Sequence, residues 1–298
     1  MALPTAWLCC PAYPLRDRDH LERAIAGAED FCKRIGHRLV VAPGMHRFGG
    51  PGMWLAPELR RSDLAAGLAH DLIIPGRGGY ACVDLVDLVL AHPGVPPPII
   101  GYSDVTVLHA CWRKKGGTGA YGWMPGVDDC GPVALASGVA AMRGEAGAID
   151  DRTGGEVMLG GAATGWLFPA CLSVLAGLVG TPAMPSLDGA ILALEDIGEA
   201  PHRIDRYLWQ LAAGGAFTGV KGLVFGKLPW NNPKEKDHQG DFSRDRAVVW
   251  CARLKLPAVF GAHFGHVKDP IALPCGRQST LQADGRGWRL TWAARDQA

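Results

Sequence analysis

The 298-residue sequence predicts an α/β protein in which a parallel-sheet domain is followed by a β-rich, barrel-like domain. In the first part of the chain, apolar strand-like runs alternate with segments of helical spacing, a pattern typical of a parallel sheet covered by helices. In the last part, short strand candidates separated by turns predominate. Hydrophobic residues make up 48% of the chain and charged residues 20%, which allows a substantial core.

The first domain is assigned to residues 1–134, where strands and helices alternate. Its expected strands are Ala6–Cys10, Arg38–Ala42, Leu72–Pro75 and Ile99–Ile100. Its expected helices are Arg18–Ile35, Glu58–Ala69, Val83–Leu90 and Val105–Lys114. In the first of these helices, apolar residues recur at helical spacing and Gly36 marks the end.

The rest of the chain has a different pattern. Residues 135–160 are rich in glycine and alanine and only weakly periodic, so we expect a connector there. The strand candidates of residues 161–298 are Ala190–Leu194, Val220–Phe225, Ala258–Phe260, Gln278–Gln282 and Trp288–Trp292. Two helices, Pro201–Ala213 and Ser243–Arg253, are expected among them, which favours a compact mixed-strand or barrel-like second domain.

The composition argues against several classes of partner. A net charge of +1 and a pI near 7.6 give no field that would gather nucleic acid or an anionic membrane. No apolar run is long enough to cross a bilayer, and the N-terminus resembles a first buried strand and not a signal peptide. The nine cysteines are scattered among apolar residues without a CxxC pair, which is typical of a reducing compartment. We therefore expect a cytoplasmic protein.

Ser103 is the first candidate for chemistry. It lies where the apolar strand Ile99–Ile100 meets a helix through a tight turn, a geometry that can expose Oγ beside backbone N–H groups of the helix start. The segment is not the GxSxG motif of α/β-hydrolases, because Val105 stands at the second glycine position. The structural alternative is a serine that caps the helix.

A glycine turn, Gly76–Gly79, follows another expected strand. Adjacent glycines can bring backbone N–H groups close to a ligand, although the turn can also be a plain strand-to-helix connection. It lacks the GxGxxG spacing of a dinucleotide site. Gly222–Lys227 is likewise no P-loop, because Leu228 replaces the serine or threonine that would hold magnesium.

Two acids and two histidines complete the candidates. Glu195 and Asp196 end an apolar strand, where either could orient a histidine or simply face solvent. His263 and His266 are three residues apart, but no HExxH sequence or third nearby ligand accompanies them, so no metal site is predicted.

Together these motifs resemble the LD-carboxypeptidase family of serine peptidases, which also holds the microcin C immunity-type peptidases. The matching segments are Leu59–Leu64, Arg77–Tyr80 (RGGY), Gly101–Thr106 (GYSD-hydrophobic-T), Leu194–Arg206 (LED…E…RIDR) and Gly265–Gly276 (GH…LP.G). Each motif is modest by itself, but their order along the chain is specific.

The resemblance implies a triad of Ser103 as nucleophile, Glu195 as orienting acid and His266 as base. It also implies a flavodoxin-like or Rossmann-like N-terminal domain, a β-rich C-terminal domain, and an oxyanion held by backbone N–H groups, which we assign to Asp104 and Gly79. Only motif position favours Glu195 and His266 over their neighbouring acid and histidine.

The activity that the resemblance implies is hydrolysis of an L,D-peptide bond in a murein tetrapeptide, with release of D-alanine and without metal or organic cofactor. The candidates for substrate binding are Arg77, Tyr80, Arg203 and Arg206. A muropeptide is the expected partner, nucleic acid and membrane are not, and a homodimer is one option for the assembly.

Two other functions compete with this one. The microcin immunity branch implies an aminoacyl- or peptidyl-nucleotide substrate, for which Trp123, Trp166 and Trp230 could supply a stacking platform, although tryptophans in so apolar a chain can equally belong to the core. A two-lobed binding protein without chemistry is the non-enzyme alternative.

Ala81 stands where the family usually has a glycine, next to the RGGY segment.

Overall fold

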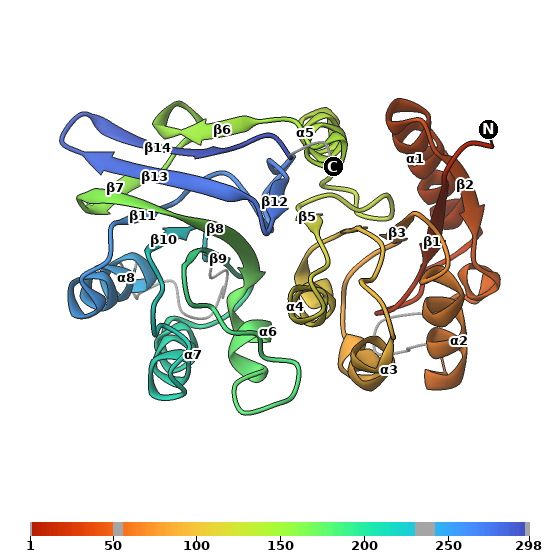
Figure 1. The fold of residues 1–298 in the computed structure, drawn as a ribbon, viewed down its shortest axis with the longest axis horizontal. Coiled ribbons are helices and arrows are strands. Elements are labelled where there is room, and N and C mark those ends of the chain that lie inside the picture. The colour runs from red at the N-terminus through yellow and green to blue at the C-terminus, as the bar shows by residue number, and fades with distance from the viewer. Residues whose placement is uncertain (1, 50–55, 230–241, 296–298) are drawn as a thin grey trace. The chain divides into compact units, whose positions relative to one another are not determined.

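The computed structural model describes residues 2–49, 56–229 and 242–295, and the chain forms two compact units (Figure 1). The first unit comprises Met1–Glu145, Pro182–Pro185 and Lys268–Cys275. The second unit comprises Ala146–Thr181, Ser186–Val267 and Gly276–Ala298. Two short segments late in the chain thus belong to the first unit.

The first unit is built on a sheet whose described strands are mostly parallel. They are β1 (Thr5–Cys9), β2 (Arg38–Val41), β3 (Leu72–Pro75), β4 (Ile99–Ile100), β5 (Gly119–Tyr121) and β12 (Leu273–Cys275). Their order is β2-β1-β3-β4-β5-β12, and only β12 is antiparallel to its neighbour. The order 2-1-3-4-5 is flavodoxin-like. The predicted parallel-sheet domain is confirmed. Of the two topologies expected for it, flavodoxin-like or Rossmann-like, the strand order matches the flavodoxin-like one.

Helices connect these strands, as the alternating pattern predicted. The described α-helices of the unit are α1 (Arg18–Ile35), α2 (Pro57–Gly67), α3 (Val86–Ala91), α4 (Thr106–Lys114) and α5 (Pro132–Arg143). The short 3-10 helices are η1 (Pro43–His46), η2 (Cys82–Leu85) and η3 (Ser103–Val105). The first helix has the predicted bounds, because the Asp17 carboxylate accepts a hydrogen bond from the His20 N–H at 2.7 Å and Gly36 ends it at φ 75°.

The second unit is built on a mixed sheet. Its described strands are β6 (Gly147–Asp150), β7 (Glu156–Leu159), β8 (Gly161–Cys171), β9 (Ala190–Glu195), β10 (Gly222–Phe225), β11 (Ala258–Phe260), β13 (Gln278–Asp284) and β14 (Gly287–Trp292). Its described α-helices are α6 (Leu172–Gly177), α7 (Pro201–Ala213) and α8 (Phe242–Leu254). The strand order is β6-β14-β13-β8-β9-β10-β11-β7, with the run from β8 to β11 parallel and the remaining pairs antiparallel.

The β-rich character of this unit is confirmed, but its barrel-like form needs correction. Strand β7 lies near β13 and β14, so the sheet curls back toward itself (Figure 1). Among the described strands, however, β6 pairs only with β14 and β7 only with β11. No hydrogen-bonded ladder in this part of the chain closes the curl, so the sheet is open.

The segment 135–160 contains regular structure. It begins within α5, passes from the first unit to the second after Glu145, and continues through β6, the 3-10 helix η4 (Asp151–Thr153) and β7. Both strands gain their order from distant partners, since β6 pairs with β14 and β7 with β11. Such long-range pairing leaves little trace in local periodicity.

The β3–β4 region of the first sheet is a buried apolar layer, since every residue of β3 and β4 is buried. Helix α4 packs beside it and places His109 within this layer, at 2% exposure. The His109 Nε2 lies 2.8 Å from the Gly101 carbonyl oxygen, which can only accept, so Nε2 carries the proton. Among the described residues, no helix has the length and apolar character that a bilayer crossing demands.

Burial makes the stability of this layer depend on pH. It lowers the pKa of His109 from 6.5 to about 4, against the opposing effect of the hydrogen bond to Gly101. The unfolded chain therefore takes up a proton before the folded chain does, and stability falls as the pH drops from 6.5 toward 4. A shift of this size corresponds to roughly 3 kcal/mol.

We expect His109→Gln, which keeps an N–H donor but does not titrate, to lose this contribution. The difference in unfolding free energy between wild type and variant, from urea titrations, should rise by roughly 3 kcal/mol between pH 4 and pH 7. A difference that stays constant across this range would contradict the assignment.

Candidate active site

Ser103 opens the 3-10 helix η3, directly after the turn that follows β4. Its φ of 66° places a non-glycine residue in the left-handed region, where backbone strain is common at functional positions. The Ser103 N–H donates to the Tyr121 hydroxyl oxygen at 3.3 Å. No side-chain capping bond forms at the start of η3 or of α4. The capping alternative therefore does not describe this serine.

The glycine turn lies against Ser103. A Cβ atom placed on Gly78 would lie 2.8 Å from the Ser103 Cβ and 3.1 Å from its Oγ, so only glycine allows this approach. Gly79 has a φ of 128°, and a Cβ there would overlap the ring of Tyr13. The backbone of the turn is thus adjacent to the serine side chain.

The residue after the serine, Asp104, is buried at 3% exposure. Its Oδ2 accepts a hydrogen bond from the Cys82 N–H at 2.8 Å, and burial raises the pKa of its carboxyl. The side chain is therefore turned toward the segment after the glycine turn.

Two substrate-binding candidates lie in or next to the glycine turn. The guanidinium of Arg77 is 6.0 Å from the centroid of the Tyr13 ring, a weak cation–π distance, and its side chain is half-buried. The side chain of Tyr80 is 50% exposed. Both residues could reach a ligand from these positions.

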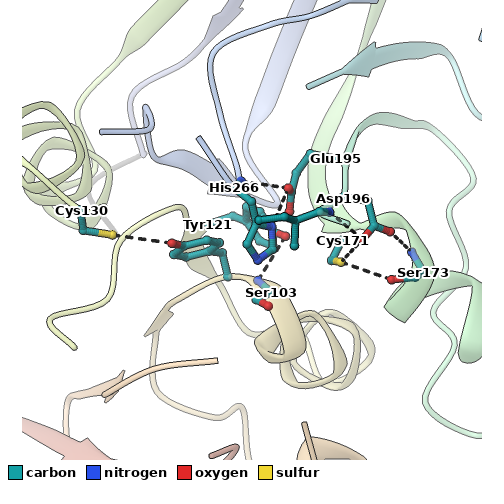
Figure 2. Close-up of polar contacts among 10 residues, drawn as sticks. Ser103, Tyr121, Cys130, Cys171, Ser173, Glu195, Asp196 and His266 are labelled. Carbon is teal, nitrogen blue, oxygen red and sulfur yellow. Dashed lines mark hydrogen bonds and ion pairs between the residues drawn. The ribbon is translucent and has the colours of Figure 1, made fainter. Parts of the chain in front are cut away.

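In the second unit, Glu195 and His266 form a direct pair (Figure 2). The Glu195 Oε2 is 2.8 Å from the His266 Nδ1, and it also accepts a hydrogen bond from the His266 backbone N–H at 2.9 Å. A carboxylate only accepts, so Nδ1 carries the ring proton and Nε2 keeps its lone pair. Glu195 has no exposed surface, whereas the His266 side chain is 15% exposed. Glu195 therefore fixes the orientation of the His266 ring and leaves its Nε2 able to accept a proton.

Two glycines make room for the buried carboxylate. Gly265, at φ 82°, lies so close that a Cβ atom would overlap the Glu195 carboxyl group. A Cβ on Gly226 would lie 2.8 Å from the Glu195 Cβ. Steric space therefore explains why glycine precedes His266, because Gly265 lets the backbone at His266 approach the Glu195 carboxylate.

Asp196 takes no part in the pair. Its Oδ2 accepts a hydrogen bond from the Ser173 N–H at 2.7 Å, and its Oδ1 lies 3.6 Å from the Cys171 sulfur (Figure 2). Burial, and next the charge of Glu195, raises its pKa to about 6. Burial and both carboxylates raise the pKa of the Cys171 thiol well above 9, so this cysteine is a thiol and not a nucleophilic thiolate.

The remaining candidates belong to the same unit as this pair. His263 is half-buried three residues before His266. Arg203 is exposed and lies 3.6 Å from the carboxylate of Glu199, four residues earlier in the chain, a long local ion pair. Arg206 is exposed on the same helix, α7. In the described parts of the chain, no three histidine, cysteine or acidic side chains gather as metal ligands.

The described tryptophans of the stacking alternative are buried. Trp123 is 3% exposed and stacks on Phe31 at 4.4 Å between ring centroids. Trp166 is 8% exposed, and its Nε1 donates to the Asp188 carbonyl oxygen at 2.9 Å. Trp230 lies outside the described residues. The two that are described belong to the core.

The structure thus places Ser103 and the glycine turn in the first unit, and pairs Glu195 with His266 in the second. Sequence reasoning missed Tyr121, whose hydroxyl accepts from the Ser103 N–H. It also missed the side-chain role of Asp104. Both contacts link residues from different strands and loops, so no local motif signals them.

Two family models match the chain. The LD-carboxypeptidase N-terminal domain matches residues 7–122 and the LD-carboxypeptidase C-terminal domain matches residues 164–281. A putative carboxypeptidase of Streptomyces coelicolor is 32% identical over 76% of this chain and 74% of its own length. The murein tetrapeptide carboxypeptidase of Pseudomonas aeruginosa is 28% identical over 72% of each chain.

Solved structures share the fold over nearly the whole chain. The muramoyltetrapeptide carboxypeptidase from Oxalobacter formigenes superposes with a TM-score of 0.78 at 24% identity, covering 96% of this chain and 99% of its own. The microcin C7 self-immunity protein MccF, in complex with aspartyl sulfamoyl adenosine, has a TM-score of 0.77 at 18% identity and covers 100% and 98%. With both domain models matched in order along the chain, the protein belongs to the LD-carboxypeptidase family and is a hydrolase of the serine peptidase type.

Proposed function

We propose that this enzyme hydrolyses the L,D-peptide bond of a murein tetrapeptide and releases the terminal D-alanine. The observation that carries the proposal is the buried Glu195 that holds the His266 ring by its Nδ1, in a chain that matches both LD-carboxypeptidase domains. The names of two relatives, a murein tetrapeptide carboxypeptidase and a probable murein peptide carboxypeptidase of Bacillus subtilis, support the choice of substrate.

In the proposed mechanism, Ser103 Oγ attacks the carbonyl carbon of the L-residue while His266 Nε2 takes the hydroxyl proton. Glu195 stabilises the imidazolium and keeps its orientation. The N–H groups of Asp104 and Gly79 hold the oxyanion. His266 then protonates the leaving amine of D-alanine, and an ester on Ser103 remains. Water, activated by His266, hydrolyses the ester and frees the shortened peptide.

The proposal divides the work between domains. The first, residues 1–134, would carry the nucleophile and the oxyanion donors, and the second, residues 161–298, would carry the acid and the base. Residues 135–160 would join them. The placement of Ser103 in one compact unit and of the Glu195–His266 pair in the other supports this division.

Binding of the substrate needs cationic or polar groups for its free carboxylate. Guanidinium groups bind carboxylates in a bidentate way, so Arg77 in the glycine turn is the favoured candidate, with Tyr80 beside it. Arg203 and Arg206 are weaker candidates, because Arg203 already lies in a local ion pair. No metal or organic cofactor is needed by this chemistry.

We place the enzyme in the cytoplasm, where it would recycle imported wall peptides, with a muropeptide and not nucleic acid or membrane as partner. The nine free cysteines support a reducing compartment. The proposal also includes a homodimer as one assembly that the enzyme can form.

The test is a comparison of substrates. Tetrapeptides with L-lysine or diaminopimelate at the third position should lose D-alanine, as read by mass spectrometry of the products, whereas a tetrapeptide that ends in L-alanine should stay intact. Cleavage of an aminoacyl-sulfamoyl adenosine without any release of D-alanine would overturn the proposal in favour of the microcin immunity-type activity. Tight binding of tetrapeptide without turnover would favour the two-lobed binding protein.

A further inference from the structure

One peptide unit beside the glycine turn is held at both of its polar groups. The carbonyl oxygen of Ala81 accepts a hydrogen bond from the Arg60 guanidinium at 2.7 Å. The N–H of the same peptide unit, which belongs to Cys82, donates to the Asp104 Oδ2 at 2.8 Å. Arg60 comes from α2 and Asp104 from η3, so two separate elements fix the orientation of a single peptide plane.

Both side chains that hold this peptide are buried. Arg60 is 1% exposed and Asp104 is 3% exposed. The same Arg60 guanidinium also donates to the Pro11 carbonyl oxygen at 3.2 Å and to the Asp84 carboxylate at 2.5 Å. The bonds from the buried Arg60 and to the buried Asp104 are stronger than surface hydrogen bonds, because water does not compete for these two side chains, whereas Asp84 is 45% exposed.

The held peptide has a strained neighbour. Ala81 has a φ of 100°, in a region that L side chains rarely adopt. Without a restraint, an alanine here would tend to turn its peptide toward an ordinary conformation. The two hydrogen bonds oppose this rotation.

The position of this peptide sets the position of the glycine turn. Ala81 is two residues after Gly79, and Gly78 packs directly on the Ser103 side chain. Asp104 follows Ser103 immediately and carries the other proposed oxyanion N–H. Its carboxylate therefore joins the two segments that would each donate to the oxyanion.

We propose that the Asp104 carboxylate is a positioning group that keeps the glycine turn in register with Ser103, so that both oxyanion donors are in place before the reaction. This inference rests on the proposed function. The Asp104 side chain acts through the Cys82 N–H and touches no substrate. Donors that are fixed in advance stabilise the charge that develops only in the transition state.

The test compares Asp104→Leu with Asp104→Asn. Leucine has nearly the same shape but no acceptor, so kcat should fall about 100-fold, as for loss of one oxyanion donor, while KM changes little. Asparagine retains one acceptor oxygen for the Cys82 N–H and should recover most of the lost kcat. Thermal unfolding of each variant shows how much of the change is structural.

Asp63 supplies a matched control in the same unit. Its buried carboxylate also accepts a hydrogen bond from a backbone N–H, that of Gly44 at 3.0 Å, in the 3-10 helix η1 that follows β2. Asp63→Leu should lower the melting temperature about as much as Asp104→Leu does, but leave kcat near the wild-type value.

Four results are decisive. A kcat loss confined to Asp104→Leu supports the inference. Equal kcat losses in both leucine variants, or a wild-type kcat in Asp104→Leu, would overturn it and leave a structural role. Ser103→Ala separates this from the proposed function: if that variant still turns over substrate, the serine mechanism itself has failed, whatever the Asp104 series shows.

Discussion

Replacing Ser103 by alanine is expected to lower kcat for tetrapeptide hydrolysis by about 10⁴-fold or more, because in the proposed mechanism the Ser103 hydroxyl forms the acyl-enzyme. The fold should be almost unaffected. Alanine keeps the Cβ atom that packs on Gly78, and the serine makes no capping bond at the start of η3. Steady-state assays of product release, together with thermal unfolding, measure both effects.

Ser137 provides the matched control for this substitution. Its hydroxyl donates to the Val133 carbonyl oxygen at 2.7 Å and accepts from the Ala272 N–H at 2.9 Å, so it joins α5 to the segment before β12. Ser137→Ala should cost about 1 kcal/mol of stability and spare turnover. Near-normal hydrolysis by Ser103→Ala would remove the basis of the serine mechanism.

Replacing His266 by alanine should be as damaging to kcat as loss of the serine, because the members of the proposed triad would act as a unit. It should also destabilise the protein by roughly 1–3 kcal/mol, since the fully buried Glu195 would lose the hydrogen bond from the His266 ring and keep the one from the His266 backbone N–H. In His266→Gln, the side-chain amide can donate to Glu195, so part of the stability should return while activity does not.

The neighbouring histidine is the control for this prediction. His263→Ala, three residues away, should retain most of the turnover. If His263→Ala abolished turnover while His266→Ala did not, the base would be the other histidine. A strict requirement for added zinc in the wild-type enzyme would point instead to a metal mechanism.

Local signals predicted much of the first sheet and its helices. The bounds of α1 follow from a capping aspartate before it and Gly36 after it, both of which act within a few residues. Strand β8 was not predicted, although it is central to its sheet. Its first half is Gly161-Ala162-Ala163-Thr164-Gly165, of low strand propensity, and its order comes from pairing with β9 and β13. Gly165 packs against the Gly189 carbonyl, so small residues here reflect close backbone approach.

The sequence predicted some residues of the candidate site and missed the tertiary contacts of others. Motif position favoured Glu195 over Asp196, and the structure supplies the physical distinction: one carboxylate meets His266, and the other caps the Ser173 N–H. The Tyr121 contact to Ser103 and the Cys82 contact to Asp104 join residues 18 and 22 positions apart across different elements. Such contacts depend on the tertiary fold, which neither spacing nor periodicity encodes.

The most direct measurement is to locate the covalent adduct after treatment of the wild-type enzyme with a fluorophosphonate, by mass spectrometry of its peptides. A serine activated by His266 should carry a single phosphonyl group on Ser103, and His266→Ala should label far more slowly. Competition by a murein tetrapeptide should slow labelling in the wild type. A modification at another residue, or equal labelling of wild type and His266→Ala, would contradict a mechanism in which Ser103 is the nucleophile and His266 its base.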